Sequence, residues 1–543
     1  MASARPTVAI IGGGHNGLTA AAYLARAGVD VTVLERLPHV GGAAVSTSGF
    51  AGLDARLSRY SYLVSLLPEQ IIRDLGLEVR LARRRYSSYT PVPPGHGPRS
   101  DRGLLIDAGD ETATRDSFAA IGAADDADGF GDFSARTTRL AAALFPTLTQ
   151  PLPTATAARE AAGAASAWSE IVDAPISDAI ERAVASDLVR GVIATDALIG
   201  TFAALDDPGL QQNRCLLYHV IGGGTGDWDV PIGGMGRVSG ELEAAARRAG
   251  AMIRTGVTVT GVTPDGEVRW STAAGEAASG GFDLVLSAVA PHVLAGLLGA
   301  EGTAGGAAAS TTTGAVPRPE GAQVKVNMLL RRLPRLREDI APEAAFGGTF
   351  HINELYSQLG AAHTAASAGR IPDPLPAEIY CHSLTDPTIL GDALRASGAH
   401  TLTVFGLHVP DRLLTRETNE RMRGELEQAV LASLDSVLAE PIEPLLLEGV
   451  GPDGTAMRAI ETKTTLDIED ALAMPGGNIF HGPLSWPWLE AEPAGPAEAW
   501  GVETAHARIL MAGSGARRGG AVSGIGGHNA AHAALELLAD RLA

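Results

Sequence analysis

Apolar runs and an alanine-rich segment alternate at the start of the chain. Val8–Ile11 is an uninterrupted apolar run, an alanine-rich stretch with helical spacing follows a cluster of glycines, and a second apolar run leads to Glu35. Short apolar runs bounded by turn residues are typical of buried strands, and the alanine-rich stretch predicts a helix. The pattern therefore predicts a strand, a turn, a helix and a second strand, as in a parallel α/β sheet.

The same alternation returns after a long helical region. The apolar spacing in residues 60–210 predicts mostly helices joined by loops. Strands and helices alternate again from Trp228 and include a buried strand within Phe282–Pro291. The stretch "GAQVKVNMLL" begins a second region of strands and helices, and Ile509–Ala512 predicts one more buried strand. We expect the first domain to resume twice along the chain.

The first turn carries glycines at the spacing of a nucleotide-binding loop. Gly12, Gly14 and Gly17 form GxGxxG between the first strand and its helix. In such loops the first glycine permits the tight turn, the second lets a pyrophosphate approach the backbone, and the third lets the helix pack closely on the strand. Glu35 ends the second strand at the position expected for a carboxylate that binds a ribose hydroxyl. The unit predicts a dinucleotide site that disfavours a 2′-phosphate.

The loop and its acid leave NAD and FAD as alternatives. The next residues, Arg36 with Gly41 and Gly42, resemble the extended motif of FAD-containing glutathione-reductase-like, amine-oxidase and phytoene-desaturase proteins. The glycine cluster "GGGTGDW" does not offer a second site, because a proline follows where a helix would begin. FAD is therefore the expected cofactor, and we expect no separate site for NAD(P).

Composition narrows the partners. The chain has 543 residues, is 45% hydrophobic and carries a formal net charge of −20, which disfavours nucleic acid and anionic membrane surfaces. Cys215 and Cys381 are far apart and form no CxxC pair, so a redox dithiol is not expected. The N-terminal sequence enters a strand without the pattern of a signal peptide, and Leu284–Ala300 is too interrupted for a membrane span. We expect a cytoplasmic protein that acts on a small molecule, with peripheral membrane contact left open.

A second glycine-rich stretch lies near the end of the chain. "GSGARRGGAVSGIGGHNAA" follows the last predicted strand and runs into an alanine-rich helix from about Gly527. A helix N-terminus offers free N–H groups and a positive dipole, which suit partial negative charge on a flavin ring. The two glycine loops are interpreted as two ends of one FAD site, the first at the pyrophosphate and adenosine, the second at the ribityl chain and flavin.

Several longer motifs, in this order, resemble one family. "GGGHNGLTAAAYLARAGVDVTVLER", "DVPIGGMG", "PGGNIFHGPLSW" and "GSGARRGGAVSGIGGHNAA" are similar to the phytoene-desaturase-related FAD oxidoreductases, in particular the branch of the pyridine nucleotide-disulfide oxidoreductase domain-containing proteins. The family fold implies an α/β protein with a Rossmann-like FAD-binding domain of the glutathione-reductase and amine-oxidase type and an inserted α+β substrate domain. The resemblance assigns residues 1–75, 215–320 and 450–543 to the FAD-binding domain, and 76–214 and 321–449 to the substrate domain.

The resemblance also implies the residues of the FAD site. The adenosine and pyrophosphate contacts are assigned to Gly12, Gly14, Gly17, Glu35, Arg36, Gly42 and Ala43, with the Val257 backbone at the adenine. The flavin end is assigned to Gly513, Ser514, Val522, Gly524 and Ile525. Many flavin domains carry an acidic residue where this chain has "AGSGARR", so backbone groups or Ser514 are expected to replace it.

Few side chains suggest chemistry of their own, since a flavin performs hydride transfer itself. Lys325, one of only two lysines, resembles the strand lysine of flavin amine oxidases, although a lysine at a strand end that reaches solvent is the alternative. His481 is a candidate acid or base near neutral pH and Trp486 a candidate flavin contact, but a hydrogen-bonded core histidine is the favoured alternative for His481. Arg517 and Arg518 are either flavin or substrate contacts or exposed. The histidines show no shared metal-ligand spacing, so no metal is predicted.

The sequence thus supports an FAD-dependent dehydrogenase or desaturase that removes hydride from a largely apolar small molecule. Oxygen or a quinone-like acceptor would reoxidise the flavin. A flavin amine oxidase, favoured by Lys325, and a redox-neutral FAD-dependent isomerase are alternatives. The GDP dissociation inhibitors share the fold as binding proteins, but they lack the intact glycine loop with its acid.

Overall fold

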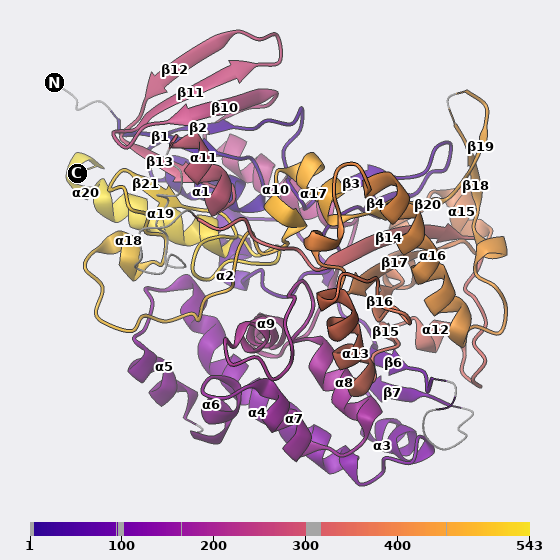
Figure 1. Ribbon diagram of the computed structural model, residues 1–543. Helices are drawn as coiled ribbons and strands as arrows, with labels where there is room; N and C mark the ends of the chain where they lie inside the picture. The colour runs from indigo at the N-terminus through magenta and orange to yellow at the C-terminus, as the bar shows by residue number, and fades with distance from the viewer. Residues whose placement is uncertain are drawn as a thin grey trace.

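The computed structural model describes residues 5–93, 95, 102–163, 165–299, 316–451 and 453–542. Its elements form three groups: a parallel sheet with covering helices, a layer of helices below it, and a second, larger sheet at the side (Figure 1). The Rossmann-like α/β class predicted from the sequence is confirmed. In the described part of the chain we find no helix with the length and apolar character needed to cross a bilayer.

The first sheet is built from three distant parts of the chain. Its strands are parallel and lie in the order β21-β13-β1-β2-β9. They are β1 (Thr7–Ile11), β2 (Asp30–Leu34), β9 (Met252–Arg254), β13 (Leu284–Ser287) and β21 (Ile509–Met511). β13 is fully buried, as its continuous apolar sequence predicts for a parallel strand covered on both faces. The central strand β1 therefore has sequence neighbours on one side and much later segments on the other.

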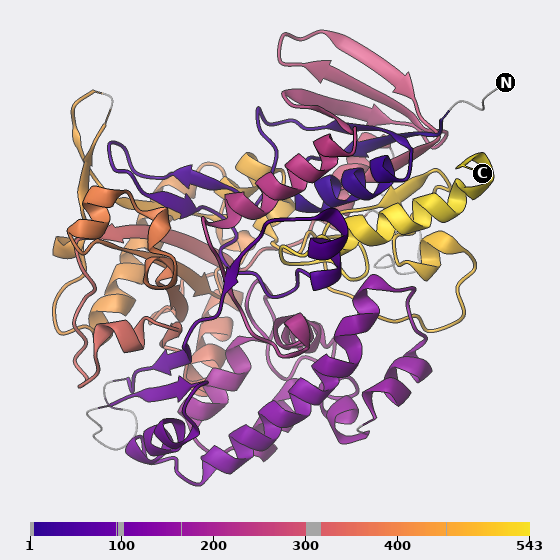
Figure 2. The same cartoon turned by 180° about the vertical axis from the view of Figure 1, so that it is seen from behind.

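Beside this sheet, a helix from the start of the chain packs against one helix from the middle and one from the end. They are α1 (His15–Arg26), α10 (Met235–Arg248) and α19 (Ile525–Leu537). Gly527 permits the close approach of α19 to α1, because a Cβ at this position would lie 1.9 Å from the carbonyl oxygen of Asn16. A three-stranded antiparallel sheet of β10 (Val257–Val262), β11 (Glu267–Thr272) and β12 (Ala277–Gly281) projects from this part, as both views show (Figures 1 and 2).

Helices dominate the middle of the chain, as the sequence predicts. They are α2 (Glu69–Leu75), α3 (Glu111–Ala120), α4 (Asp126–Leu144), α5 (Ala155–Ala162), α6 (Ala165–Ile171), α7 (Ile176–Ala183), α8 (Asp187–Thr195) and α9 (Gln211–Val220). The sequence pattern did not predict β6 (Tyr86–Thr90) and β7 (Leu104–Asp107), two adjacent strands that extend the second sheet.

The second sheet has seven strands in the order β20-β14-β17-β16-β15-β6-β7. The remaining strands are β14 (Gln323–Leu330), β15 (Thr349–Ile352), β16 (Ala377–Tyr380), β17 (His400–Leu407) and β20 (Ile460–Lys463). Helix α16 (Asn419–Val437) packs against β14, β15 and β20. The proposed domain boundaries stay a prediction, and β20 argues for moving one of them, since it lies within 450–543 yet pairs with β14.

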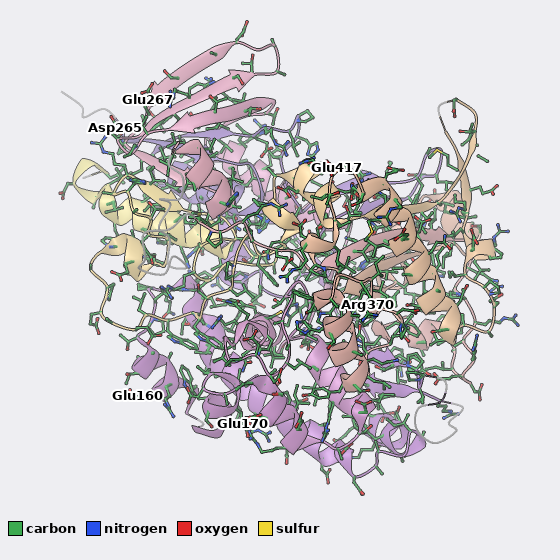
Figure 3. The ribbon with its side chains drawn as sticks, viewed as in Figure 1. Glu160, Glu170, Asp265, Glu267, Arg370 and Glu417 are labelled. Atoms are coloured by element: carbon green, nitrogen blue, oxygen red, sulfur yellow. The ribbon has the colours of Figure 1, made fainter. Side chains whose placement is uncertain are left out.

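Short elements connect these parts. The strands are β3 (Ser46–Ser48), β4 (Arg56–Ser58), β5 (Leu81–Ala82), β8 (Val230–Pro231), β18 (Glu448–Val450) and β19 (Ala456–Arg458). The helices are α11 (Pro291–Leu297), α12 (Pro342–Ala345), α13 (Tyr356–Ser367), α14 (His382–Thr385), α15 (Asp392–Ala396), α17 (Thr465–Leu472), α18 (Pro496–Ala499) and α20 (Ala539–Leu542). Charged side chains labelled in Figure 3, such as Glu160, Asp265 and Glu417, are exposed on these different parts, as expected for a highly charged surface.

Candidate functional site

One cavity of about 520 Å³ reaches from the first sheet to the second sheet and the helical layer. This volume lies within the range of ~300–1,000 Å³ that is usual for small-molecule sites. Its wall includes Glu35 at the end of β2, Lys325 on β14 and Phe133 on α4. The cavity therefore joins the nucleotide loop to the region predicted to hold substrate.

The glycine loop has the local geometry that its sequence predicts. Gly12 adopts φ 98°, which favours glycine, and a Cβ on Gly17 would lie only 2.1 Å from the Gly12 carbonyl oxygen. Helix α1 begins after Gly14 without a side-chain cap, so amides of its first turn are available to an anion. A Cβ on Gly14 would meet only Gly42 Cα, at 3.9 Å. The loop thus leaves room for a pyrophosphate.

Glu35 closes this loop from the next strand. Its carboxylate accepts hydrogen bonds from the backbone N–H of Gly13, at 2.7 Å, and of Leu37, at 2.8 Å. The backbone N–H of Val257 donates to the Glu35 carbonyl oxygen at 2.9 Å, so the strand predicted at the adenine begins beside the acid. The arrangement places a carboxylate and the first residue of β10 together in the wall of the cavity.

Most of the predicted site residues meet in this cavity. It is lined by Gly12, Gly14, Gly17, Glu35, Arg36, Gly42, Ala43, Val257, Ser514, Val522, Lys325 and His481. Gly513, Gly524 and Ile525 are buried but are not part of this wall. A Cβ on Gly513 would meet the Ala288 carbonyl oxygen at 2.8 Å, Gly524 caps α19 at φ 74°, and Ile525 packs in the apolar core of the helical layer. Ligand contacts for the whole set stay predictions.

Lys325 lies in the interior of the second sheet. It is only 2% exposed, so it is not a strand-end lysine that reaches solvent. Its Nζ donates to the carbonyl oxygens of Ser58, at 3.1 Å, and Tyr60, at 2.5 Å, and lies 4.5 Å from the centre of the Tyr62 ring. Burial lowers its pKa well below the usual value. The two backbone carbonyl oxygens thus hold the amine at the cavity wall.

Two histidines, the buried His15 and the half-buried His481, line the cavity. Burial lowers the pKa of both His481 and His15 to about 4, and His481 further lowers that of His15. Both imidazoles are therefore neutral near pH 7, which differs from the expectation that His481 exchanges protons there. His15 Nε2, His481 Nδ1 and Asn16 Oδ1 are buried without hydrogen-bond partners among the described residues. These orphaned polar atoms fit a polar cofactor that would satisfy them.

The other expected flavin contacts lie elsewhere. Trp486 is outside the cavity wall and stacks on Trp488, with ring centres 5.1 Å apart. Arg518 is 2% exposed rather than at the surface, and its guanidinium donates to the Thr147 carbonyl oxygen. Arg517 donates to the Trp488 carbonyl oxygen at 3.2 Å. Both arginines therefore bind backbone in the helical layer and the loop before α18.

The sequence did not predict a set of polar side chains on the part of the cavity wall that the second sheet and the helical layer form. We call this part the far wall. This wall includes Arg84, Asp196, His219, His351, Glu378 and Tyr380, which come from five separate segments of the chain. Burial of a charge is costly unless it is paired, so a set of buried ionisable side chains in a cavity indicates a functional site. Apolar side chains beside them are Phe130, Phe133, Val192, Ile193, Ile199 and Leu216. The wall can therefore bind a molecule with an apolar body and a polar group.

We expect the protein to lose stability as pH falls from 7 to 5. Burial lowers the folded-state pKa of His15, His481 and His528 to about 4 and of His382 and His408 to about 3, whereas unfolded histidine titrates near 6.5. The unfolded chain then binds more protons, so the free energy of unfolding decreases between about pH 6.5 and 4. The thermal unfolding midpoint should be lower at pH 5 than at pH 7.

A variant can isolate one of these histidines. His408 is 1% exposed, both ring nitrogens lack partners among the described residues, and its φ is 54°. Asparagine tolerates this backbone conformation, so His408→Asn should fold and show a smaller drop between pH 7 and pH 5. An unfolding midpoint that does not change with pH would contradict the assignment of neutral buried histidines.

Comparison with known proteins agrees with this architecture. Residues 10–61 match the NAD(P)-binding Rossmann-like domain family. The chain is 56% identical to an uncharacterised protein of Mycobacterium tuberculosis over 98% of both chains. Cyclohexylamine oxidase from Brevibacterium oxydans has a similar fold, with a TM-score of 0.54 at 14% identity over 98% of this chain and all of that one.

One relative with a descriptive name is similar over almost the full length. The pyridine nucleotide-disulfide oxidoreductase domain-containing protein 2 of Rattus norvegicus is 30% identical over 96% of this chain and 92% of its own. The chain belongs to the family of pyridine nucleotide-disulfide oxidoreductase domain-containing protein 2.

Proposed function

We propose that the protein is an FAD-dependent oxidoreductase that removes hydride from a small molecule with an apolar body. The observation that carries this proposal is the continuity of one cavity from the glycine loop and Glu35 to Lys325 and the far wall. A dinucleotide that begins at the loop would extend toward the second sheet, where a substrate can meet its far end. The oxidoreductase family of the chain supports the same class of reaction.

The two ends of the site would hold different parts of FAD. The first turn of α1 would bind the pyrophosphate, and Glu35 with the Val257 backbone would bind the adenosine. Ser514 and Val522, from the second glycine stretch, and Lys325 would surround the flavin. When bound, FAD supplies acceptance of a hydride, and the protein supplies orientation, electrostatics and exclusion of water.

Side chains of the cavity would determine the charge, the hydrogen bonding and the access of solvent at the flavin. The neutral His15 and His481 add no positive charge at pH 7, and their unpartnered nitrogens can accept or donate hydrogen bonds. The Lys325 amine, held by the Ser58 and Tyr60 carbonyls, can hold a water or a polar substrate group through a hydrogen bond. The apolar side chains of α4 and α8 would exclude solvent from the reacting atoms.

The proposed electron acceptor is neither a second dinucleotide nor a cysteine pair. The glycine cluster after α9 forms a short 3-10 turn over Gly222–Gly224 that no described α-helix continues, so it lacks the strand–loop–helix of a dinucleotide site. Cys215 and Cys381 are both buried and lie on different segments. Oxygen or a quinone-like molecule is therefore the proposed acceptor, in a cytoplasmic protein.

An amine oxidase is the second candidate. Lys325 favours it, because this buried lysine lines the cavity from an interior strand, as expected for the strand lysine of flavin amine oxidases. The similarity in fold to cyclohexylamine oxidase is compatible with this candidate. The sequence also resembles the phytoene-desaturase-related proteins, so a carbon–carbon dehydrogenation stays within the proposal.

The first experiment is an absorption spectrum of the purified protein. Heat release of the chromophore and its mass would then identify the cofactor. A yellow protein that releases FAD supports the proposal and permits anaerobic screening of alcohols, amines and alkenes by loss of flavin absorbance. A colourless protein that FAD does not reconstitute would contradict it and favour a binding role.

Glu35→Ala should weaken FAD retention about 10- to 100-fold. A hydrogen bond to a charged group contributes ~1.5–3 kcal/mol, and alanine removes both the ribose acceptor and the bonds to the Gly13 and Leu37 amides. Equilibrium dialysis of the variant against FAD measures the change. Arg254→Ala, at the exposed end of the neighbouring strand β9, is the control and should retain FAD. Equal affinity of Glu35→Ala and wild type would remove Glu35 from the site.

A further inference from the structure

Two carboxylates and one imidazole lie on the far wall of the cavity, and a third carboxylate, that of Glu354, bonds to the imidazole from behind the wall. His351 on β15, Glu354 after it and Glu378 on β16 are 4%, 1% and 1% exposed. Glu378 and His351 line the cavity together with Asp196, at the end of α8. Three acidic groups in one buried place cannot all be charged without a compensating positive charge or a bound proton.

Hydrogen bonds hold the Glu378 carboxyl in a fixed position. Thr195 Oγ1 lies 3.2 Å from Oε1, and the Tyr380 hydroxyl bonds to Oε2. Tyr380 in turn packs on Tyr62, with ring centres 4.8 Å apart, and the Tyr62 ring lies under the Lys325 amine. This chain of contacts connects Glu378 with the residue that faces the proposed flavin.

His351 and Glu354 form a separate pair beside it. His351 Nδ1 lies 2.7 Å from Glu354 Oε2 and 4.0 Å from Glu378 Oε1. Two ligands of one tetrahedral metal ion with bonds of ~2.1 Å lie about 3.4 Å apart, so the shorter contact is a charge-assisted hydrogen bond. The spacing suits an ion pair that shares a proton, with Glu378 as its cavity-facing neighbour.

The surroundings favour a proton on Glu378 at neutral pH. Burial, with the charges of Glu354 and Asp196, raises its pKa to about 8, although His351 and the Tyr380 hydroxyl act in the opposite direction. Burial by itself would lower the pKa of His351, but the neighbouring carboxylates outweigh it and raise that pKa. The charged and titratable groups around Glu378 are Arg84, Asp196, Cys215, His351, Glu354, Tyr62 and Tyr380.

We propose that Glu378 is the proton-exchanging residue of the cavity, with His351 and Glu354 as positioning residues. The proposal rests on the proposed flavin function. The substrate would carry a C–H bond beside an O–H or N–H group. The C–H bond breaks and its electron pair leaves as hydride to the flavin, which is reduced by two electrons. The O–H or N–H proton passes to Glu378 in its ionised form, which is the minor form at pH 7 and becomes the major form above about pH 8, and a C=O or C=N bond forms.

The class of substrate follows from this geometry. An alkane or polyene offers no proton on a heteroatom, so a carboxyl held at the cavity wall would have no partner in its oxidation. An alcohol or amine with an apolar body uses both the carboxyl and the apolar side chains of the same wall. A group whose pKa lies near the working pH is efficient in either direction of proton transfer.

Infrared difference spectra of the purified holoprotein test whether Glu378 binds and releases a proton. Between pH 6 and pH 10, wild type should lose the carbonyl stretch of one protonated carboxyl, with a midpoint within about one unit of 8. The isosteric Glu378→Gln, which keeps one carbonyl acceptor for either Thr195 or Tyr380 and presents an NH₂ donor to the other hydroxyl, should lack this change. His351→Gln should raise the midpoint, because the imidazolium lowers the pKa of Glu378. A titrating band that persists in Glu378→Gln would overturn the assignment.

The pH dependence of the flavin midpoint potential tests whether proton exchange by Glu378 is coupled to reduction of the flavin. If Glu378 exchanges protons beside the flavin, the slope of potential against pH should change near the carboxyl midpoint in wild type and not in Glu378→Gln. Glu427→Gln, which replaces an acceptor for Thr462 outside the cavity, is the matched control and should resemble wild type. Identical slopes in wild type and Glu378→Gln would overturn the catalytic role. If the purified protein contains no flavin, the proposed FAD-dependent function is contradicted. The carboxyl titration can still be measured in that protein.

Discussion

Gly17→Ala should yield a protein without bound FAD and with a lower thermal unfolding midpoint. The alanine Cβ would lie 2.1 Å from the Gly12 carbonyl oxygen and 3.2 Å from Ala288 Cβ, whereas real Cβ contacts are essentially never below 3.0 Å. Helix α1 must then move away from β1, and the amides of its first turn leave the position where they would meet the pyrophosphate. Flavin absorbance per protein and differential scanning fluorimetry measure both effects.

A second helical glycine provides the control for this change. Gly240 lies within α10, and a Cβ there meets no heavy atom within 4 Å. Gly240→Ala should therefore retain FAD and be more stable by ~0.5–1 kcal/mol, since alanine is the better helix former. Normal flavin content in Gly17→Ala would contradict the close contact between helix and strand.

Lys325→Met should leave FAD bound but slow reoxidation of the reduced flavin about 100-fold. Methionine keeps the length and the apolar part of the side chain but removes the amine that bonds to the Ser58 and Tyr60 carbonyls. Positioned acids and bases contribute ~10²–10⁴-fold to rates, so an effect at the lower end of this range is expected for an amine that orients one water. Anaerobic photoreduction followed by mixing with oxygenated buffer measures the step without a known substrate.

The only other lysine is a matched control. Lys463 on β20 is the register partner of Lys325 on β14, but it lies outside the cavity wall and 3.6 Å from Glu461. Lys463→Met should reoxidise at the wild-type rate. Equal rates for Lys325→Met and wild type would return Lys325 to a structural role.

The sequence predicted the parts of the site that are local in the chain. The glycine loop and Glu35 belong to one strand–helix–strand unit, whose spacing follows from backbone geometry alone. Lys325 attracted attention because the chain has only two lysines and this one lies in an apolar strand. In each case a short segment contains the whole signal.

The far wall could not be predicted in this way. Glu378, Asp196 and His351 lie on β16, α8 and β15, and each appears in sequence as an ordinary polar residue. Their proximity depends on the antiparallel pairing of β15 with β16, which places His351 opposite Glu378, and on the docking of α8. The sequence did not predict β6 and β7 for a related reason, because β6 pairs with the distant β15.

The place of β21 in the first sheet has a consequence for how the protein is made. β21 completes the edge of that sheet beside β13, and α19, which follows it, packs on α1 from the opposite end of the chain. A ribosome that is still translating this last segment therefore holds a chain whose nucleotide loop lacks its partner helix. Loading of the proposed cofactor should therefore follow synthesis of α19, and a messenger truncated before the codon for Ile509 should produce a protein that cells degrade before it binds FAD.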